Sequence, residues 1–407
     1  MKRWLVMLLP FLLCTGGLTW VAGDIRLFLT TSPIAELGLD PSEIHRNEKG
    51  QVTRIVVTKT RVTDGLLKRL PRLRYLRYLW LAGSPVSDQG MRSLSRLPNL
   101  RDLFLNRTNV TGTGAVHLQA LSELERLVLS DAPVNDRGLA SVARLKHLRI
   151  LQLDGTRITD AGASHLRHLT TLVDLDVSGT QLTNRAIADL AQLGTLKSLR
   201  LRNTGLAGTL RFPKPSGLRS LDLSENPDLL GLSVEGIPAI QMLNLRRTGI
   251  SDETFQPRSV LRELRDLNLS ETSITGASLG SLASSPSLQW LDLSGSQADD
   301  RGLKQLQPLK QLRVLLLGRT RISDGAGQSL GQLSALVDLD LSQTSIGDTC
   351  VGALTSLKSL KRLVLQRTRV SDRRSDELKR ALPQLRIITA VENPREDPPV
   401  APGNQAT

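Results

Sequence analysis

The stretch LRILQLDGTRITDAGASHLRHL at residues 148–169 contains the pattern that decides the fold. Its general form is L-x-x-L-x-L-x-x-T-x-I-T-D-x-G-L-x-x-L-x-x-L, and along most of the chain it begins again 24 residues later. The units begin at Val52, Leu76, Leu100, Leu124, Leu148, Leu172, Leu196, Leu218, Ile240, Leu264, Leu288, Leu312, Leu336 and Leu360, with a partial unit at Leu385. A fixed period in this range is typical of a solenoid of stacked units.

Each unit divides into two parts. Residues 100–105 (LRDLFL) alternate apolar and variable side chains, which predicts a short strand. Residues 136–145 (DRGLASVARL) place apolar side chains three apart, which predicts one short α- or 3₁₀-helical segment. A Ser/Thr-Asp pair precedes most of these segments, as at Thr159-Asp160, and we expect one residue of the pair to cap the helix rather than to ligate calcium. The sequence therefore predicts an α/β solenoid.

On these motifs the chain resembles the leucine-rich repeat proteins over residues 52–390. It looks most like their bacterial T-D-x-G-L class, which is related to the repeats of ribonuclease inhibitor and of F-box leucine-rich proteins. The resemblance implies a horseshoe with a parallel concave sheet, short outer helices and a protein-binding concave face; it does not imply an enzyme. The ninth position, usually Asn or Cys in the family, is Thr in ten units, such as Thr108 and Thr156. We expect these hydroxyls to bridge successive coils as an Asn ladder does.

The 24-residue spacing of the repeat is interrupted near residues 206–240, where two successive units are 22 residues long. Pro213 and Pro215 lack the backbone donor that a regular helix needs, so this stretch is expected to form an extended back wall. Shorter outer segments predict a locally flatter curvature. The break is either a tolerated variant of the repeat or a hinge or docking point.

The two ends of the chain differ from the repeats. Lys2 and Arg3 precede an apolar run at residues 4–22, so residues 1–23 fit either a cleaved signal peptide or a retained membrane anchor. Lipidation at Cys14 fits less well, because Leu13 stands where a small residue is expected. In each case the repeats are exported to the periplasm or cell surface, or held outside the cytoplasm by the anchor, and only residues 4–22 are expected in a membrane. Residues 24–51 are interpreted as an N-terminal cap with a hairpin loop at residues 47–50, and residues 391–407 as a disordered tail.

Function is expected on the variable strand positions, which project from the concave face. In the first units these are the aromatic and aliphatic residues Val56, Tyr78, Trp80, Phe104, Val128 and Ile150. Clustered exposed aromatic residues usually mark a binding site, so we predict a protein partner here. The alternative is that the N-terminal cap covers them. Further along, the same positions are acidic and are also predicted to contact the partner: Asp174, Asp176, Asp222, Asp292 and Asp340.

The net charge of +14 suggests a second kind of partner. A row of basic residues borders the Thr column: Lys59, Arg107, Arg247, Arg319 and Arg367. This basic edge could bind an anionic envelope polymer or surface. Nucleic acid is disfavoured, because the concave centre is acidic and no aromatic residues are interleaved with the basic row.

Motifs for catalysis are missing from the sequence. His147, His165 and His168 are not joined by a Cys or carboxylate at metal-ligand spacing, so we expect no metal site, no cofactor and no enzymatic activity. A substrate-recognition adaptor like the F-box leucine-rich proteins is a further alternative. However, residues 24–51 are too short to hold an F-box.

Overall fold

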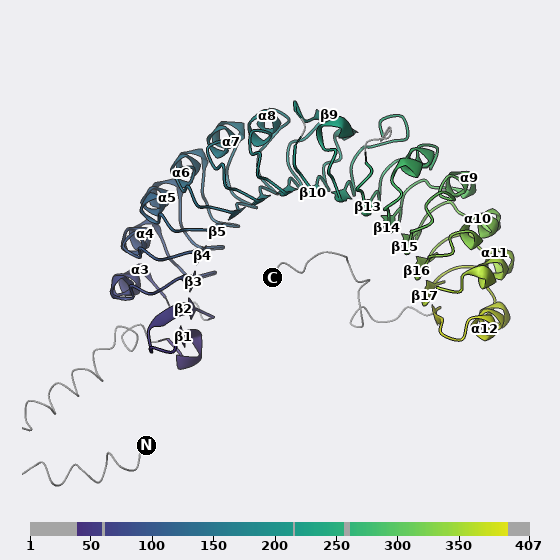
Figure 1. Ribbon diagram of the computed structural model, residues 1–407, viewed down its shortest axis with the longest axis horizontal. Helices are drawn as coiled ribbons and strands as arrows, with labels where there is room; N and C mark the ends of the chain where they lie inside the picture. Colours follow the sequence, from purple (N-terminus) through teal and green to yellow (C-terminus); the bar gives the residue numbers. More distant parts are fainter. Residues whose placement is uncertain (1–38, 59–61, 215, 256–260, 390–407) are drawn as a thin grey trace, which may run out of the picture.

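The computed structural model describes residues 39–58, 62–214, 216–255 and 261–389. They form a curved array in which the strands line the inner wall and the helices lie outside (Figure 1). The proposed signal peptide or anchor at residues 1–23, the first part of the cap, the tail at residues 391–407 and Lys59 lie outside the described residues.

One 16-stranded sheet forms the inner wall, and its strands follow each other in chain order. The strands are β1 (Ile44–Arg46), β2 (Val52–Val56), β3 (Tyr78–Trp80), β4 (Asp102–Phe104), β5 (Arg126–Val128), β6 (Ile150–Gln152), β7 (Asp174–Asp176), β8 (Ser198–Arg200), β10 (Ser220–Asp222), β12 (Met242–Asn244), β13 (Asp266–Asn268), β14 (Trp290–Asp292), β15 (Val314–Leu316), β16 (Asp338–Asp340), β17 (Arg362–Val364) and β18 (Arg386–Ile388). From β2 onward every neighbouring pair is parallel and equivalent residues of successive units face each other, as Leu79, Leu103 and Leu127 do. This confirms the predicted solenoid and its register.

Outside the irregular region, the outer wall consists mainly of short α- and 3₁₀-helices. They are α3 (Asp64–Leu67), η3 (Leu70–Arg72), α4 (Asp88–Leu94), α5 (Gly112–Ala115), η4 (Val116–Ala120), α6 (Asp136–Val142), α7 (Asp160–Leu166), α8 (Ala186–Leu190), η6 (Leu279–Ser284), α9 (Asp300–Lys304), η7 (Asp324–Ala326), α10 (Gly327–Gly331), α11 (Asp348–Ala353), η8 (Leu354–Ser356) and α12 (Asp372–Ala381). The 3₁₀ segments η2 (Pro41–Glu43) and η5 (Val234–Gly236) lie at the N-terminal end and in the irregular region.

The irregular region has strands in place of outer helices. β9 (Gly208–Arg211) and β11 (Leu229–Ser233) pair in parallel and form a separate two-stranded sheet on the outer side. An extended chain can place its backbone donors and acceptors in this ladder without the helical bonds that Pro213 would interrupt. The predicted extended back wall is therefore present.

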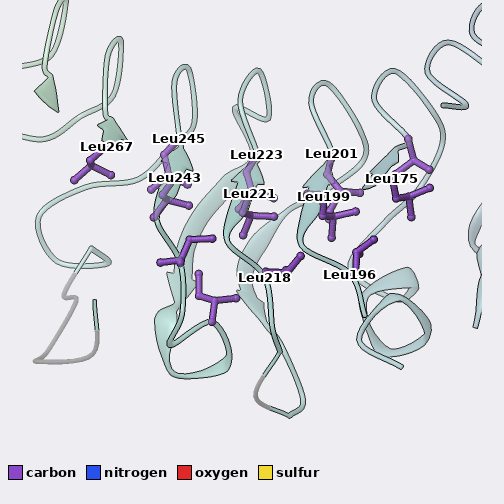
Figure 2. Packing of buried hydrophobic residues seen from close by; sticks show 14 of the residues in the cluster. Leu175, Leu196, Leu199, Leu201, Leu218, Leu221, Leu223, Leu243, Leu245 and Leu267 are labelled. Atoms are coloured by element: carbon purple, nitrogen blue, oxygen red, sulfur yellow. The ribbon is translucent and has the colours of Figure 1, made fainter. Parts of the chain in front are cut away.

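Leucines from the two walls form one continuous core along the array. Figure 2 shows how the equivalent residues Leu175, Leu199, Leu221, Leu243 and Leu267 follow each other from unit to unit. Each of these side chains is at most 2% exposed. A single unit could not bury such a row, so stacking of the units stabilises the fold.

The recurring Asp residues connect successive units instead of capping their own helices. Thr159 caps α7, because its side chain accepts a hydrogen bond from the N–H of Ala161. Asp136, one unit earlier, accepts hydrogen bonds from the N–H (2.8 Å) and the hydroxyl (2.7 Å) of Thr159. The same inter-unit bonds join Asp64 to Ser87, Asp88 to Thr111, Asp160 to Thr183, Asp252 to Thr275, Asp300 to Ser323 and Asp348 to Ser371. Burial acts to raise the pKa of Asp88, but hydrogen bonds from Thr111 and Thr113 hold that pKa below its usual value.

The predicted bridging by the Thr column is wrong. The Thr108 hydroxyl donates to the carbonyl of Leu105 in its own unit (2.6 Å), and Thr156 and Thr180 do the same with Leu153 and Val177. The Thr204 hydroxyl also donates to its own unit, at Leu201, and reaches the next unit only because the longer side chain of Asn226 meets it there (3.1 Å). Asn226, at the same position of the irregular unit, reaches further and donates to Leu201 of the preceding unit (2.8 Å).

Candidate functional site

An aromatic cluster lies on the concave face of the first units. The rings of Trp80 and Phe104 are stacked, with centroids 4.6 Å apart, and the ring of Tyr78 is tilted against Phe104 at 5.0 Å. The guanidinium of Arg54 lies over the Tyr78 ring, 4.0 Å from its centroid. These contacts hold Trp80 and Tyr78 in fixed orientations while both side chains remain half-buried. We call Tyr78, Trp80 and Phe104 the aromatic patch.

The other predicted members of this site lie at different depths. Val56, Trp80, Phe104 and Val128 follow each other in one row across β2–β5. Phe104 and Val128 are only 8% and 5% exposed, because neighbours on both sides cover them, so they form the floor of the site. They are therefore not the exposed contacts that the sequence predicted.

Ile150 belongs to the second row of the concave face, three strands from Tyr78. An ion pair between Arg126 and Asp102 (3.6 Å) separates the two side chains. The structure therefore brings Tyr78 and Trp80 together against Phe104, places Val56 beside Trp80, and places Ile150 apart from them.

The described part of the N-terminal cap leaves the aromatic patch uncovered. β1 pairs antiparallel with β2 and thereby extends the sheet by one strand, with its turn at residues 47–50 as predicted. The buried carboxylate of Glu43 accepts hydrogen bonds from the N–H (3.0 Å) and the hydroxyl (2.6 Å) of Thr58, which ties the cap to the end of the sheet. Residues 39–51 therefore do not cover the patch, whereas residues 24–38 of the predicted cap lie outside the described residues, so coverage by that part of the cap stays an open alternative.

The predicted acidic residues are engaged with other groups of the protein. Arg200 binds Asp174 (2.8 Å) and Asp176 (2.7 Å) at once, so these two carboxylates are neutralised by a basic residue on the next strand. Asp222, Asp292 and Asp340 each accept a hydrogen bond from the N–H two residues further on, at 2.8–2.9 Å. These three residues shape the turn after the strand, a structural role that the sequence reading missed.

Asp266, on the concave strand β13, has a strongly raised pKa. It lies between Met242 and Trp290 in the sheet, where burial raises its pKa to about 6 and the charge of Arg265 opposes only part of this shift. An unfolded Asp has a pKa of about 3.9. The native state therefore holds the extra proton between about pH 4 and pH 6, and the free energy of unfolding falls as the pH rises through that window.

Asp266→Asn is therefore expected to stabilise the protein at neutral pH. The variant removes a charge that costs about 1–2 kcal/mol above pH 6, whereas at about pH 4 the wild-type carboxyl is already mostly neutral. Urea unfolding at the two pH values measures the difference. An equal gain in the free energy of unfolding at both pH values, or no gain at neutral pH, would show that the buried charge of Asp266 does not destabilise the protein.

The predicted basic edge carries mixed charges. Arg107 pairs with Asp131 (3.3 Å), and Arg247 lies against both Glu225 and Glu271. Arg319 also approaches Glu271 (3.5 Å). A hollow of about 590 Å³ on this edge includes Asp154 and Glu225 beside Arg202 and Arg247. Arg367 is exposed there, but the edge as a whole is not a continuous positive row.

Other candidate chemistry is limited among the described residues. No group of His, Cys, Asp or Glu residues there could hold a metal ion. Cys350 is a buried free thiol whose pKa burial raises to about 12, which does not suit a nucleophile. None of the helices in the described ranges is long and apolar enough to span a bilayer.

Comparisons with known proteins agree on the fold. The family model described as "Leucine Rich repeat" matches residues 144–166. A leucine-rich repeat protein of Leptospira interrogans has a similar structure, with 23% sequence identity and a TM-score of 0.62, and the match covers 79% of this chain and 80% of that one. No curated protein matches the sequence significantly.

Two similar structures are complexes. The TLR13–ssRNA13 complex matches at 19% identity and a TM-score of 0.59, over 79% of this chain and 46% of that one. The LRIM1/APL1C complex matches at 17% identity and a TM-score of 0.55, over 78% and 57%. At these identities the likeness extends to the fold alone.

Proposed function

We propose that this leucine-rich repeat protein binds a protein partner on its concave face, with Trp80 and Tyr78 as the anchoring residues. The observation that carries the proposal is the aromatic patch, in which two half-buried rings are fixed against the buried ring of Phe104 and left uncovered by the described cap. Aromatic residues are only 3% of the chain, so three in contact on one face are a concentrated feature.

The physical chemistry of the patch suits a binding site. A rigid aromatic side chain buries a large apolar area on binding while losing little conformational entropy. Arg54 beside Tyr78 adds a polar group at the rim, which is the arrangement that binding hot spots share. Two of the similar structures are complexes, which supports a binding role for the fold without identifying this partner.

The remaining parts of the proposal rest on the sequence. We place the repeats outside the cytoplasm, because Lys2 and Arg3 precede the apolar run at residues 4–22. We assign no catalysis to the protein. Binding of an anionic polymer through the basic edge is less well supported, because Arg107, Arg247 and Arg319 are engaged with carboxylates on neighbouring coils.

Photo-crosslinking in the native cell tests the proposal. A photoreactive amino acid at Val56, beside the patch, is expected to form a covalent adduct with one protein that mass spectrometry then identifies. The same amino acid at Arg137, exposed on the outer helix α6, is the control and should not capture that protein. Capture of the same protein from Arg137 but not from Val56 would move the binding site to the outer wall and overturn the proposal.

A further inference from the structure

A repeated pair of basic residues precedes five strands of the sheet. The two residues are three apart in sequence and flank a buried leucine, as in Arg74-Tyr75-Leu76-Arg77. The pairs are Arg74 and Arg77, Lys146 and Arg149, Arg262 and Arg265, Lys310 and Arg313, and Lys358 and Lys361. All ten residues are exposed, and together we call them the basic flank.

The basic flank lies on one side of the curved array. Since the strands from β2 to β18 are parallel and in register, the residues that precede them are all on the same flank. Figure 1 looks along the shortest axis of the molecule and shows the units arranged in an arc, so this flank is one of the two broad sides of the arc. Ten positive charges therefore point from one broad side of the protein.

A smaller number of acidic residues lies among these charges: Glu123 and Glu125 line a hollow with Arg149, and Glu263 stands between Arg262 and Arg265 in the sequence. None of the ten residues forms an ion pair with another residue of the described ranges. The nearby basic residue Arg101 does pair with Glu125 (3.1 Å). On the opposite side, Arg107, Arg247 and Arg319 contact acidic residues of the neighbouring coils. Other arginines of that side are exposed and form no ion pair within the described ranges: Arg157, Arg321, Arg367 and Arg369. The basic flank is thus a positive surface that attracts anions from solution.

An exposed aromatic residue lies on the same flank. Tyr75 is 54% exposed and is one of two strongly exposed large apolar side chains in the described part of the chain. It lines a hollow of about 600 Å³ in which the charged residues are Arg46, Lys49 and Arg77 with one carboxylate, Glu48. A tyrosine ring beside basic side chains suits the headgroup region of a bilayer, where its ring is partly immersed and its hydroxyl stays wet.

We propose that the basic flank docks on a membrane surface that contains anionic lipids. A broad side with distributed positive charge and an exposed tyrosine fits a planar anionic surface, whereas a linear polymer would have to follow the arc to meet all five pairs. In this orientation the strands run perpendicular to the membrane plane, and the concave face is directed parallel to the membrane rather than toward it. The aromatic patch stays accessible to a partner, so this proposal does not depend on the proposed function.

Vesicle sedimentation with the full chain tests the proposal. The probes are vesicles of equal parts phosphatidylglycerol and phosphatidylcholine, and vesicles of phosphatidylcholine alone. The variant K146Q/R149Q/K310Q/R313Q removes four charges from the basic flank. It is expected to lower partitioning onto the anionic vesicles by up to roughly 1000-fold at low ionic strength. Added salt should weaken wild-type binding in the same way.

The matched control removes four exposed arginines from the opposite side, in R157Q/R321Q/R367Q/R369Q. The apolar segment at residues 4–22 is common to all variants and contributes equally to their binding. The proposal predicts that the control keeps most of its selectivity for anionic vesicles. Equal losses in both variants, or no selectivity in the wild type, would overturn it, as would wild-type binding to soluble dextran sulfate but not to anionic vesicles.

Discussion

Replacing Trp80 by Ala is expected to weaken binding of the crosslinked partner by about 2–4 kcal/mol, which is roughly 30- to 1000-fold in Kd. The indole is stacked on Phe104 and is only half-buried, so the variant loses a large preorganised apolar surface. Tyr78→Ala should add to the loss, because both rings rest on Phe104. Calorimetric or surface-binding measurements with the purified partner give the change in Kd.

Trp290→Ala is the matched control for this prediction. Trp290 is also a half-buried tryptophan on a concave strand, β14, far along the array from the aromatic patch. Its removal should change Kd by no more than about threefold, which is within the range of a residue outside the contact. If Trp290→Ala weakens binding as much as Trp80→Ala, the partner does not depend on the first units.

Replacing Asn226 by Ala is expected to lower the free energy of unfolding by about 3–4 kcal/mol. Its side chain is 1% exposed and donates to the carbonyls of Leu201 and Leu223, both at 2.8 Å. It also accepts from the N–H of Thr204 at 2.9 Å. The variant leaves the Thr204 N–H and the Leu223 carbonyl without these partners. Urea unfolding followed by circular dichroism measures the loss.

Thr180→Val is the control for Asn226, because Thr180 occupies the same position of a regular unit. Its hydroxyl makes one local bond, to Val177, and its loss should cost only about 1 kcal/mol. A cost for Asn226→Ala as small as that of Thr180→Val would mean that the inter-unit bonds of Asn226 do not hold the irregular region together.

Most of the fold follows from the period of the sequence. The spacing of the leucines determines which side chains enter the core, and Pro213 correctly indicated that the chain before it does not form an outer helix. The hydrogen bonds between successive units could not be predicted from the spacing of the sequence in this way. A repeated Asp, such as Asp136, is equally compatible with capping its own helix and with binding the next unit, and only the distance to Thr159 decides between them.

The candidate site was predictable in its position but not in its depth or pairing. Strand alternation placed Trp80 and Phe104 on the concave face, yet burial of Phe104 depends on how its neighbours fill the row. The acidic character of the concave face was overestimated, because two of its carboxylates are paired with Arg200. Arg200 and the two Asp residues that it binds are 24 and 26 residues apart, and the unit register could have revealed this pairing.

Shielding of Trp80 on partner binding tests the central claim most directly. In a variant with Trp4, Trp20 and Trp290 replaced by Phe, Trp80 is the only fluorescent tryptophan. We expect the partner to reduce acrylamide quenching of Trp80 several-fold, because the partner covers the part of the indole that is exposed in the free protein. Unchanged quenching while the partner is bound would show that it binds elsewhere and would contradict the assignment of the aromatic patch.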